Sequence, residues 1–206
     1  MDHTRRTQRS YDLIAAQFFA RHQNRSVLHP WMVRFAAAVP AGGVVLDLGA
    51  GPCHDSAQLR ALGLSVISLD RSKHMLNVAS ERFPGARVQA DLRQLPFRPN
   101  SIAGVWASAS LLHLDRHELA PALAGVREVL GESGVLFMSL KRGAGEGWET
   151  TKYGGEAPRW FTYWHEQDVD AALLAAGFDL VEAATRAGTE VEWLMRIARR
   201  CIDVPE

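Results

Sequence analysis

The stretch of sequence that decides the fold is residues 44–51, which read Val-Val-Leu-Asp-Leu-Gly-Ala-Gly. It opens with a short run that is apolar at successive positions, as in a parallel strand covered on both faces. The run leads through Asp47 into Gly49 and Gly51, whose missing side chains let the backbone approach a ligand closely. These residues predict a buried strand that ends in a glycine turn beside a binding site.

Strands alternate with helices downstream of this turn. Such alternation is typical of βαβ units, and it predicts an α/β fold, a three-layer α/β/α sandwich around a doubly wound, mostly parallel sheet. The segment 141–159 is rich in glycine and charge and is expected to be a loop. Hydrophobic runs and turn residues predict strands at 65–69, 87–90, 102–107, 135–140, 178–184 and 191–198, a helix that ends near residue 63, and helices over 72–79, 115–130 and 165–176.

The length and composition favour one domain. The chain has 206 residues, of which 47% are hydrophobic, enough for one sizeable core and too few for two ordinary domains. We expect a single domain over residues 1–206, in which helices within 1–40 form an N-terminal lid and 41–206 form a Rossmann-like core.

Charge and cysteine content limit the partners. Lys and Arg together number 23, and so do Asp and Glu, so the formal net charge is zero. A protein that binds along RNA or DNA normally carries a basic excess, so the balance disfavours nucleic acid. Two cysteines without a CxxC pair, no secretory segment and no apolar run of about 18 residues predict a cytoplasmic protein without a membrane partner. The oligomeric state stays open.

Three acidic residues follow consecutive predicted strands. In an open α/β sheet, ligands bind beyond the carboxyl ends of the strands, where Asp47, Asp70 and Asp91 are expected to meet. Asp70 lies about twenty residues past the glycine turn, where a carboxylate accepts hydrogen bonds from both ribose hydroxyls. Asp91 is placed to receive an adenine amino group. Together the three acids predict a nucleoside site.

These stretches resemble the motifs of class I, Rossmann-like S-adenosylmethionine-dependent methyltransferases. Residues 44–51 are similar to the first motif, 69–76 (LDRSKHML) to the second, 90–97 (ADLRQLPF) to the third, and 101–114, ending in LLHL, to the fourth. The resemblance covers residues 10 to about 200. It departs after Gly51, where Pro52 and Cys53 stand in place of the third glycine of many relatives.

The resemblance implies a seven-stranded sheet whose last strand, at 191–198, is antiparallel. It also implies S-adenosylmethionine as the cofactor and S-adenosylhomocysteine as its product. The start of the N-terminal helix, Tyr11 to Ala15, is similar to that of many small-molecule methyltransferases, in which this helix closes over the amino-acid tail of the cofactor. The cofactor contacts implied or expected are Tyr11, Asp47, Gly49, Gly51, Asp70, Arg71, Met75, Asp91, Leu92, Ala107 and Ser108.

Methyl transfer from a sulfonium needs alignment first, and a base only if the acceptor holds a proton. The candidate bases are His113, after the fourth strand, and His165, ahead of the last helix. A metal is not expected, because His113 and His117 lack a third well-placed ligand.

Aromatic residues alternate with cations after the fifth strand, which favours an acidic or planar small-molecule acceptor. The candidate acceptor contacts there are Arg142, Tyr153 and Tyr163.

Three other functions are compatible with parts of the pattern. A nicotinamide dehydrogenase shares the acid after the second strand, but the turn lacks the last glycine of G-x-G-x-x-G. A tRNA methyltransferase that acts on wobble uridines shares the helix start and the Leu-Pro-Phe segment, against which the neutral charge argues. A non-catalytic relative that binds a nucleoside is the third, and the intact binding acids count against it.

Overall fold

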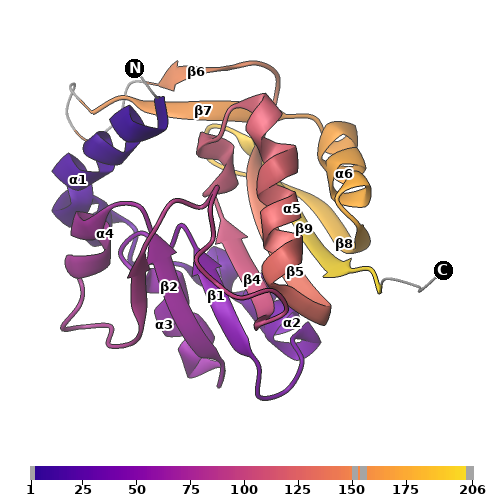
Figure 1. Cartoon of the computed structure of the whole chain (residues 1–206). Helices are drawn as coiled ribbons and strands as arrows, with labels where there is room; N and C mark the ends of the chain where they lie inside the picture. The colour runs from indigo at the N-terminus through magenta and orange to yellow at the C-terminus, as the bar shows by residue number, and fades with distance from the viewer. Residues whose placement is uncertain (1–2, 150–152, 154–156, 203–206) are drawn as a thin grey trace.

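The computed structural model describes residues 3–149, 153 and 157–202. In chain order the helices and strands follow the predicted alternation (Figure 1). The elements are α1 (His3–Arg21), α2 (His29–Ala38), β1 (Val44–Leu48), α3 (His54–Ala61), β2 (Ser65–Asp70), α4 (Lys73–Asn77), β3 (Arg87–Gln89), β4 (Ile102–Ser108), α5 (Leu119–Val129), β5 (Leu130–Arg142), β6 (Glu146–Glu149), β7 (Arg159–Trp164), α6 (Glu166–Ala175), β8 (Phe178–Ala187) and β9 (Glu192–Arg200), with short 3-10 turns at Ser26–Leu28, Leu111–His113 and Arg116–Glu118.

The sheet has the predicted doubly wound order. Parallel pairs join β3, β2, β1, β4 and β5 in that sequence, so the order reverses at β1. β9 then pairs antiparallel with β5, and β8 pairs antiparallel with β9. The predicted α/β class and the antiparallel last strand are therefore confirmed, whereas the predicted number of seven strands is wrong, because the described residues form a sheet of nine. The reversal places the carboxyl ends of β1 and β4 side by side, where a ligand site is expected.

Helices cover both faces of the sheet, as the apolar runs of its central strands require (Figure 1). On one face α5 and α6 pack on β4 and β5. On the other face α2 and α3 cover Trp106 and Phe137, which stack with their ring centroids 3.8 Å apart and are fully buried. β1 lies between these layers, so all of its residues after Val44 are buried.

The chain after β5 differs from the prediction. Part of the segment expected to be a loop forms β6, and the predicted loop ends at the first residue of an unpredicted strand, β7. The two pair antiparallel, and β7 also runs parallel beside the end of β5, with Lys141 opposite Tyr163. The glycines around β6 favour a loop. Pairing between β6 and β7 and the aromatic side chains, which favour strands, instead hold these residues as a hairpin.

The helix expected over 72–79 is shorter, although Ser72 caps it as predicted, its hydroxyl accepting the N–H of Met75 at 3.0 Å. Among the described residues, no helix is both long and apolar enough to cross a bilayer.

Candidate cofactor and acceptor site

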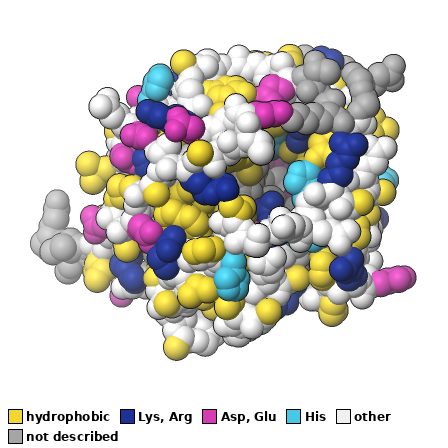
Figure 2. Space-filling view, turned by 180° about the vertical axis from the view of Figure 1, so that it is seen from behind, with side chains coloured by type: hydrophobic (Ala, Val, Ile, Leu, Met, Phe, Trp, Pro, Cys, Tyr) yellow, Lys and Arg dark blue, Asp and Glu magenta, His cyan; other side chains and the backbone are white. Residues whose placement is uncertain are grey.

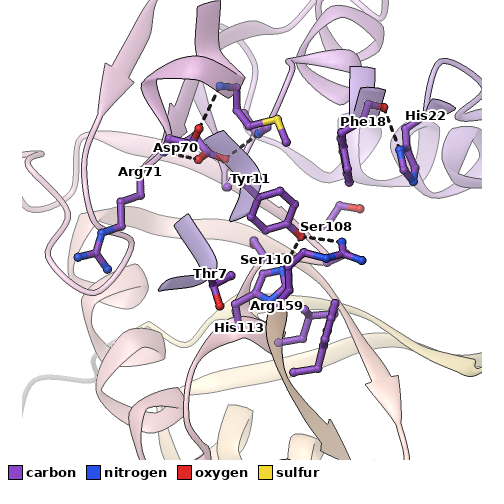
Figure 3. A pocket seen from close by; sticks show the side chains of 18 of the residues that line it. Thr7, Tyr11, Phe18, His22, Asp70, Arg71, Ser108, Ser110, His113 and Arg159 are labelled. Atoms are coloured by element: carbon purple, nitrogen blue, oxygen red, sulfur yellow. Dashed lines mark hydrogen bonds between the residues drawn. The ribbon is translucent and has the colours of Figure 1, made fainter. Parts of the chain in front are cut away.

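A cavity of about 680 Å³ opens at the carboxyl ends of β1, β2 and β4. α1 and β7 form part of its wall, so segments far apart in the sequence enclose it (Figure 3). Of the predicted site residues, the cavity is lined by Tyr11, Asp47, Gly49, Gly51, Asp70, Arg71, Met75, Asp91, Leu92, Ser108, His113, Tyr153 and Tyr163.

The glycine turn brings backbone to the cavity wall. Gly49 and Gly51 have positive φ angles of 75° and 51°, which favour glycine. The N–H groups of Gly49 and Ala50 both donate to the carbonyl of Leu69, which ties the end of β1 to that of β2. A Cβ added at Gly49 would overlap the side chain of Ser110. One added at Gly51 would meet no atom within 4 Å in the described part of the chain. Gly49 is therefore required for packing against Ser110, whereas the absence of a side chain at Gly51 leaves space in the cavity.

Asp70 ends β2 with its carboxylate at the cavity. One oxygen accepts the N–H of Gly51 and the other accepts the N–H of Ser72, both at 2.8 Å. Burial outweighs these hydrogen bonds and raises the pKa of Asp70 to about 6. A carboxylate has about four acceptor positions. Asp70 is therefore fixed in place with positions left for a pair of ligand hydroxyls.

Asp91 also reaches the cavity, but its carboxylate is shared. Arg93 Nη2 lies 2.7 Å and Arg71 Nη1 3.3 Å from the same oxygen. Burial alone raises the pKa of Asp91, but the hydrogen bonds and charges of these arginines bring it below its usual value. The adenine contact stays a prediction, and the structure adds that two cations already hold this acid.

A buried polar network lies beneath the turn. Asp47 is 2% exposed and accepts the hydroxyl of Ser56 at 2.5 Å. Burial and the neighbouring Asp55 raise the pKa of Asp47 to about 7. Asp55 in turn binds Arg25 through two hydrogen bonds of 2.6 and 2.8 Å and accepts the indole N–H of Trp106 at 2.9 Å. Burial opposes ionisation of Asp55, but Arg25 holds its pKa below the usual range.

Arg25 lines the cavity and was missed by the sequence analysis. It stands between α1 and α2, without a motif or a periodic position to mark it. Its side chain also donates to the hydroxyl of Ser108 at 3.3 Å. Arg25 thus links the N-terminal segment to the end of β4.

The imidazole of His113 is hydrogen-bonded to Tyr11 and to Trp160, so neither of its nitrogens is available as a base. Its Nδ1 lies 2.6 Å from the carbonyl oxygen of Trp160, which can only accept, so Nδ1 carries the hydrogen. Nε2 therefore accepts the hydroxyl of Tyr11 at 2.8 Å, and that hydroxyl also accepts from Arg159 at 3.2 Å. Burial lowers the pKa of His113 to about 3. The expected role as general base is not supported by this geometry, which makes His113 a positioning residue for Tyr11.

Two predicted contacts do not reach the cavity. Arg142 is exposed and forms ion pairs with Glu192 at 2.6 Å and Glu166 at 3.7 Å. Ala107 is fully buried within β4 and does not line the cavity. Successive side chains of a strand point to opposite faces, so Lys141 lines the cavity in place of Arg142, and Ser108, which was also predicted, lines it beside the buried Ala107. The prediction was therefore off by one residue at the end of β5, whereas at the end of β4 it included the residue that lines the cavity.

The wall near β7 combines rings and charges. Lys141 pairs with Glu149 at 2.6 Å and lies 3.5 Å from the centroid of the Phe161 ring. Glu149 also accepts the hydroxyl of Tyr163. Tyr153 contributes a further ring. This half of the cavity can therefore hold a flat molecule against aromatic faces.

Comparison with known proteins agrees with this arrangement. Residues 46–138 match the family described as "Methyltransferase domain". A demethylmenaquinone methyltransferase of Beutenbergia cavernae is 38% identical over 90 residues, which are 43% of this chain and 35% of that protein. The chain thus aligns with about a third of the length of the curated relatives it matches.

Solved structures show the same fold. The 1,6-didemethyltoxoflavin-N1-methyltransferase of Burkholderia thailandensis, solved with 1,6-didemethyltoxoflavin and S-adenosylhomocysteine bound, has a TM-score of 0.74 at 20% identity, covering 98% of this chain and 91% of that one. A S-adenosylmethionine-dependent methyltransferase from Methanosarcina mazei has a TM-score of 0.73 at 16% identity, covering 81% and 96%.

The matched segment runs from the glycine turn to the middle of β5, and it contains all three acids of the site. The sheet order supports the same assignment. Residues 46–138 therefore match a methyltransferase domain, and the chain has the fold of solved S-adenosylmethionine-dependent methyltransferases.

Proposed function

We propose that this protein transfers the methyl group of S-adenosylmethionine to a small-molecule acceptor. The observation that carries the proposal is a single cavity that joins the glycine turn and Asp70 to a compartment walled by aromatic rings. When bound, the cofactor supplies a methyl group on a positively charged sulfur. The chain's part is then to align the two ligands and to exclude water.

The residues of the cavity suit the parts of this cofactor. Asp70 accepts the ribose hydroxyls, and the open space over Gly51 admits the ligand close to backbone. The tail of the cofactor carries an ammonium and a carboxylate, and the cavity is lined by Asp47 of β1 and by Arg25, which lies between α1 and α2. Asp47 is the ammonium partner in this assignment, and Arg25 is the carboxylate partner.

Small molecules are favoured over RNA as acceptors. The formal net charge is zero. On the face shown in Figure 2, acidic and basic side chains alternate and form no continuous basic patch. The relatives are also named for small acceptors, demethylmenaquinone and 1,6-didemethyltoxoflavin. Phosphate-tracking proteins instead need clustered cations.

Cofactor binding is tested by calorimetry with S-adenosylhomocysteine, with NAD as a negative control. We expect Asp70→Asn to weaken binding at least about tenfold, since two charge-assisted hydrogen bonds to hydroxyls are lost. Asp168→Asn is the matched control, because Asp168 is half-exposed on α6 and outside the cavity. Equal affinity of the Asp70 variant and the wild type would contradict the ribose assignment, and binding of NAD would favour a dehydrogenase.

Methyl transfer itself is tested with cofactor labelled in the methyl group and a cell extract divided into small molecules and RNA. We expect label in the small-molecule fraction only. Label in the RNA fraction would support the tRNA alternative. Cofactor binding without transfer to either fraction would support a non-catalytic relative.

A further inference from the structure

Arg159, the first residue of β7, lies in an aromatic cage at the cavity wall. Its guanidinium carbon is 5.4 Å from the ring centroid of Tyr11, 5.5 Å from that of Tyr153 and 5.1 Å from that of Phe161. One terminal nitrogen donates to the hydroxyl of Tyr11, whereas the buried Nε has no hydrogen-bond partner among the residues that the structure describes. The rings fix the position of the cation and leave part of its donor set unused.

Among the described residues Arg159 has no acidic partner, unlike three other cations of the cavity. Lys141 pairs with Glu149, Arg25 with Asp55 and Arg71 with Asp91. For Arg159, no carboxylate oxygen of the described residues lies within ion-pair distance. Arg159 is partly buried, and its Nε is fully so. Partial burial of a charge without a counter-charge has a cost that the rings offset only in part, and an anion in the cavity would supply the counter-charge.

The position of Arg159 assigns this anion to the acceptor rather than the cofactor. In Figure 3 the Tyr11 side chain lies between Asp70 on one side and Arg159 with His113 on the other. Asp70 belongs to the nucleoside half, at the end of β2, whereas Arg159 faces the half walled by Phe161 and Tyr153.

We propose that Arg159 recognises the methyl acceptor as a planar organic anion with its charge on oxygen, a carboxylate, enolate or phenolate. This proposal rests on the proposed function. His113 is poorly suited to remove a proton, because its acceptor nitrogen is occupied by Tyr11. An acceptor that is already anionic needs no base. Its nucleophilic atom bonds to the methyl carbon as the carbon–sulfur bond breaks and the electron pair stays on sulfur. The negative charge of the acceptor and the positive charge of the sulfonium cancel, and no proton has to leave.

The test compares two probes of equal shape, 2-naphthoate and the neutral 2-naphthamide, titrated into protein saturated with S-adenosylhomocysteine. We expect the wild type to prefer the anion by about ten- to a hundredfold, as for a hydrogen-bonded ion pair. Arg159→Met keeps the length and the contacts with the rings and should lose the preference, whereas Arg159→Lys should retain part of it. Arg142→Met is the matched control, because Arg142 is an exposed arginine of the same region whose ion pairs lie outside the cavity. Its preference should equal that of the wild type.

Cofactor affinity and thermal unfolding are measured on the same variants. The proposal is overturned if the wild type shows no preference for the anion, or if Arg159→Met keeps it. It is also overturned if Arg159→Met weakens S-adenosylhomocysteine binding more than about tenfold while remaining folded, because Arg159 would then serve the cofactor tail. Failure of the wild type to bind S-adenosylhomocysteine at all would instead refute the proposed function.

Discussion

Alanine at Gly49 and at Gly51 should have opposite consequences. Both positions have positive φ, so either substitution costs about 1–2 kcal/mol in backbone strain. At Gly49 the new Cβ also overlaps Ser110 Cβ and comes within 3.2 Å of its hydroxyl oxygen, and such overpacking adds about 1–3 kcal/mol. At Gly51 the Cβ points into open space. Gly49→Ala should therefore lower the free energy of unfolding by about 2–5 kcal/mol and Gly51→Ala by about 1–2 kcal/mol.

Ligand binding should be affected at the other glycine, Gly51, where the loss of stability is smaller. Because Gly51 lines the cavity, a methyl group there occupies space meant for the cofactor, and we expect Gly51→Ala to weaken S-adenosylhomocysteine binding at least about tenfold. Urea unfolding without ligand measures the first effect, and calorimetry on the folded variant measures the second. Equal losses of stability, or unchanged affinity in Gly51→Ala, would refute the division of roles between the two glycines.

Two further predictions concern buried charge. The pKa of His113 is lowered by burial to about 3, whereas an unfolded histidine titrates near about 6.5; the stability that neutral His113 contributes is therefore complete above that pH and is lost as the pH falls towards 3. Paired urea titrations should show that the destabilisation caused by His113→Asn shrinks between pH 7.5 and 5, and a constant difference would contradict the buried, neutral assignment. Arg25→Met leaves the carboxylate of Asp55 buried without its partner and should lower the free energy of unfolding by about 3–5 kcal/mol. Adding Asp55→Leu should restore part of that loss in the same assay, and no recovery would show that Arg25 acts through other contacts.

The sequence predicted the sheet because its central strands carry their own signal. Short apolar runs that end at acidic residues located β1, β2 and β3 within a residue or two. β7 was missed for a physical reason, since its pairing with β5 and β6 depends on residues distant in the chain. Arg142 was chosen in place of Lys141 because a pattern of composition does not fix which face of a strand a side chain occupies.

Buried networks were the least predictable part of the site. Arg25 and Asp55 carry no spacing signal, and they meet only because α2 and α3 cover the same face of the sheet. The tautomer of His113 likewise depends on the carbonyl of Trp160, which lies in the unpredicted strand. Sequence patterns register periodicity and turn chemistry, whereas these contacts arise from tertiary packing.

α1 is attached to the rest of the protein by a small apolar cluster, in which Ile14 and Ala15 pack on Met75, and by polar contacts around the cavity. Ser10 donates to the carbonyl of Pro158, the N–H of Trp160 donates to Thr7, and Ser72 donates to Asp12. Such a helix opens locally at a smaller free-energy cost than the sheet, so its amides should exchange with deuterium sooner than those of β4 or β5. We expect a local opening of this N-terminal helix to set the residence time of the product, in which case its amides should exchange more slowly when S-adenosylhomocysteine is bound.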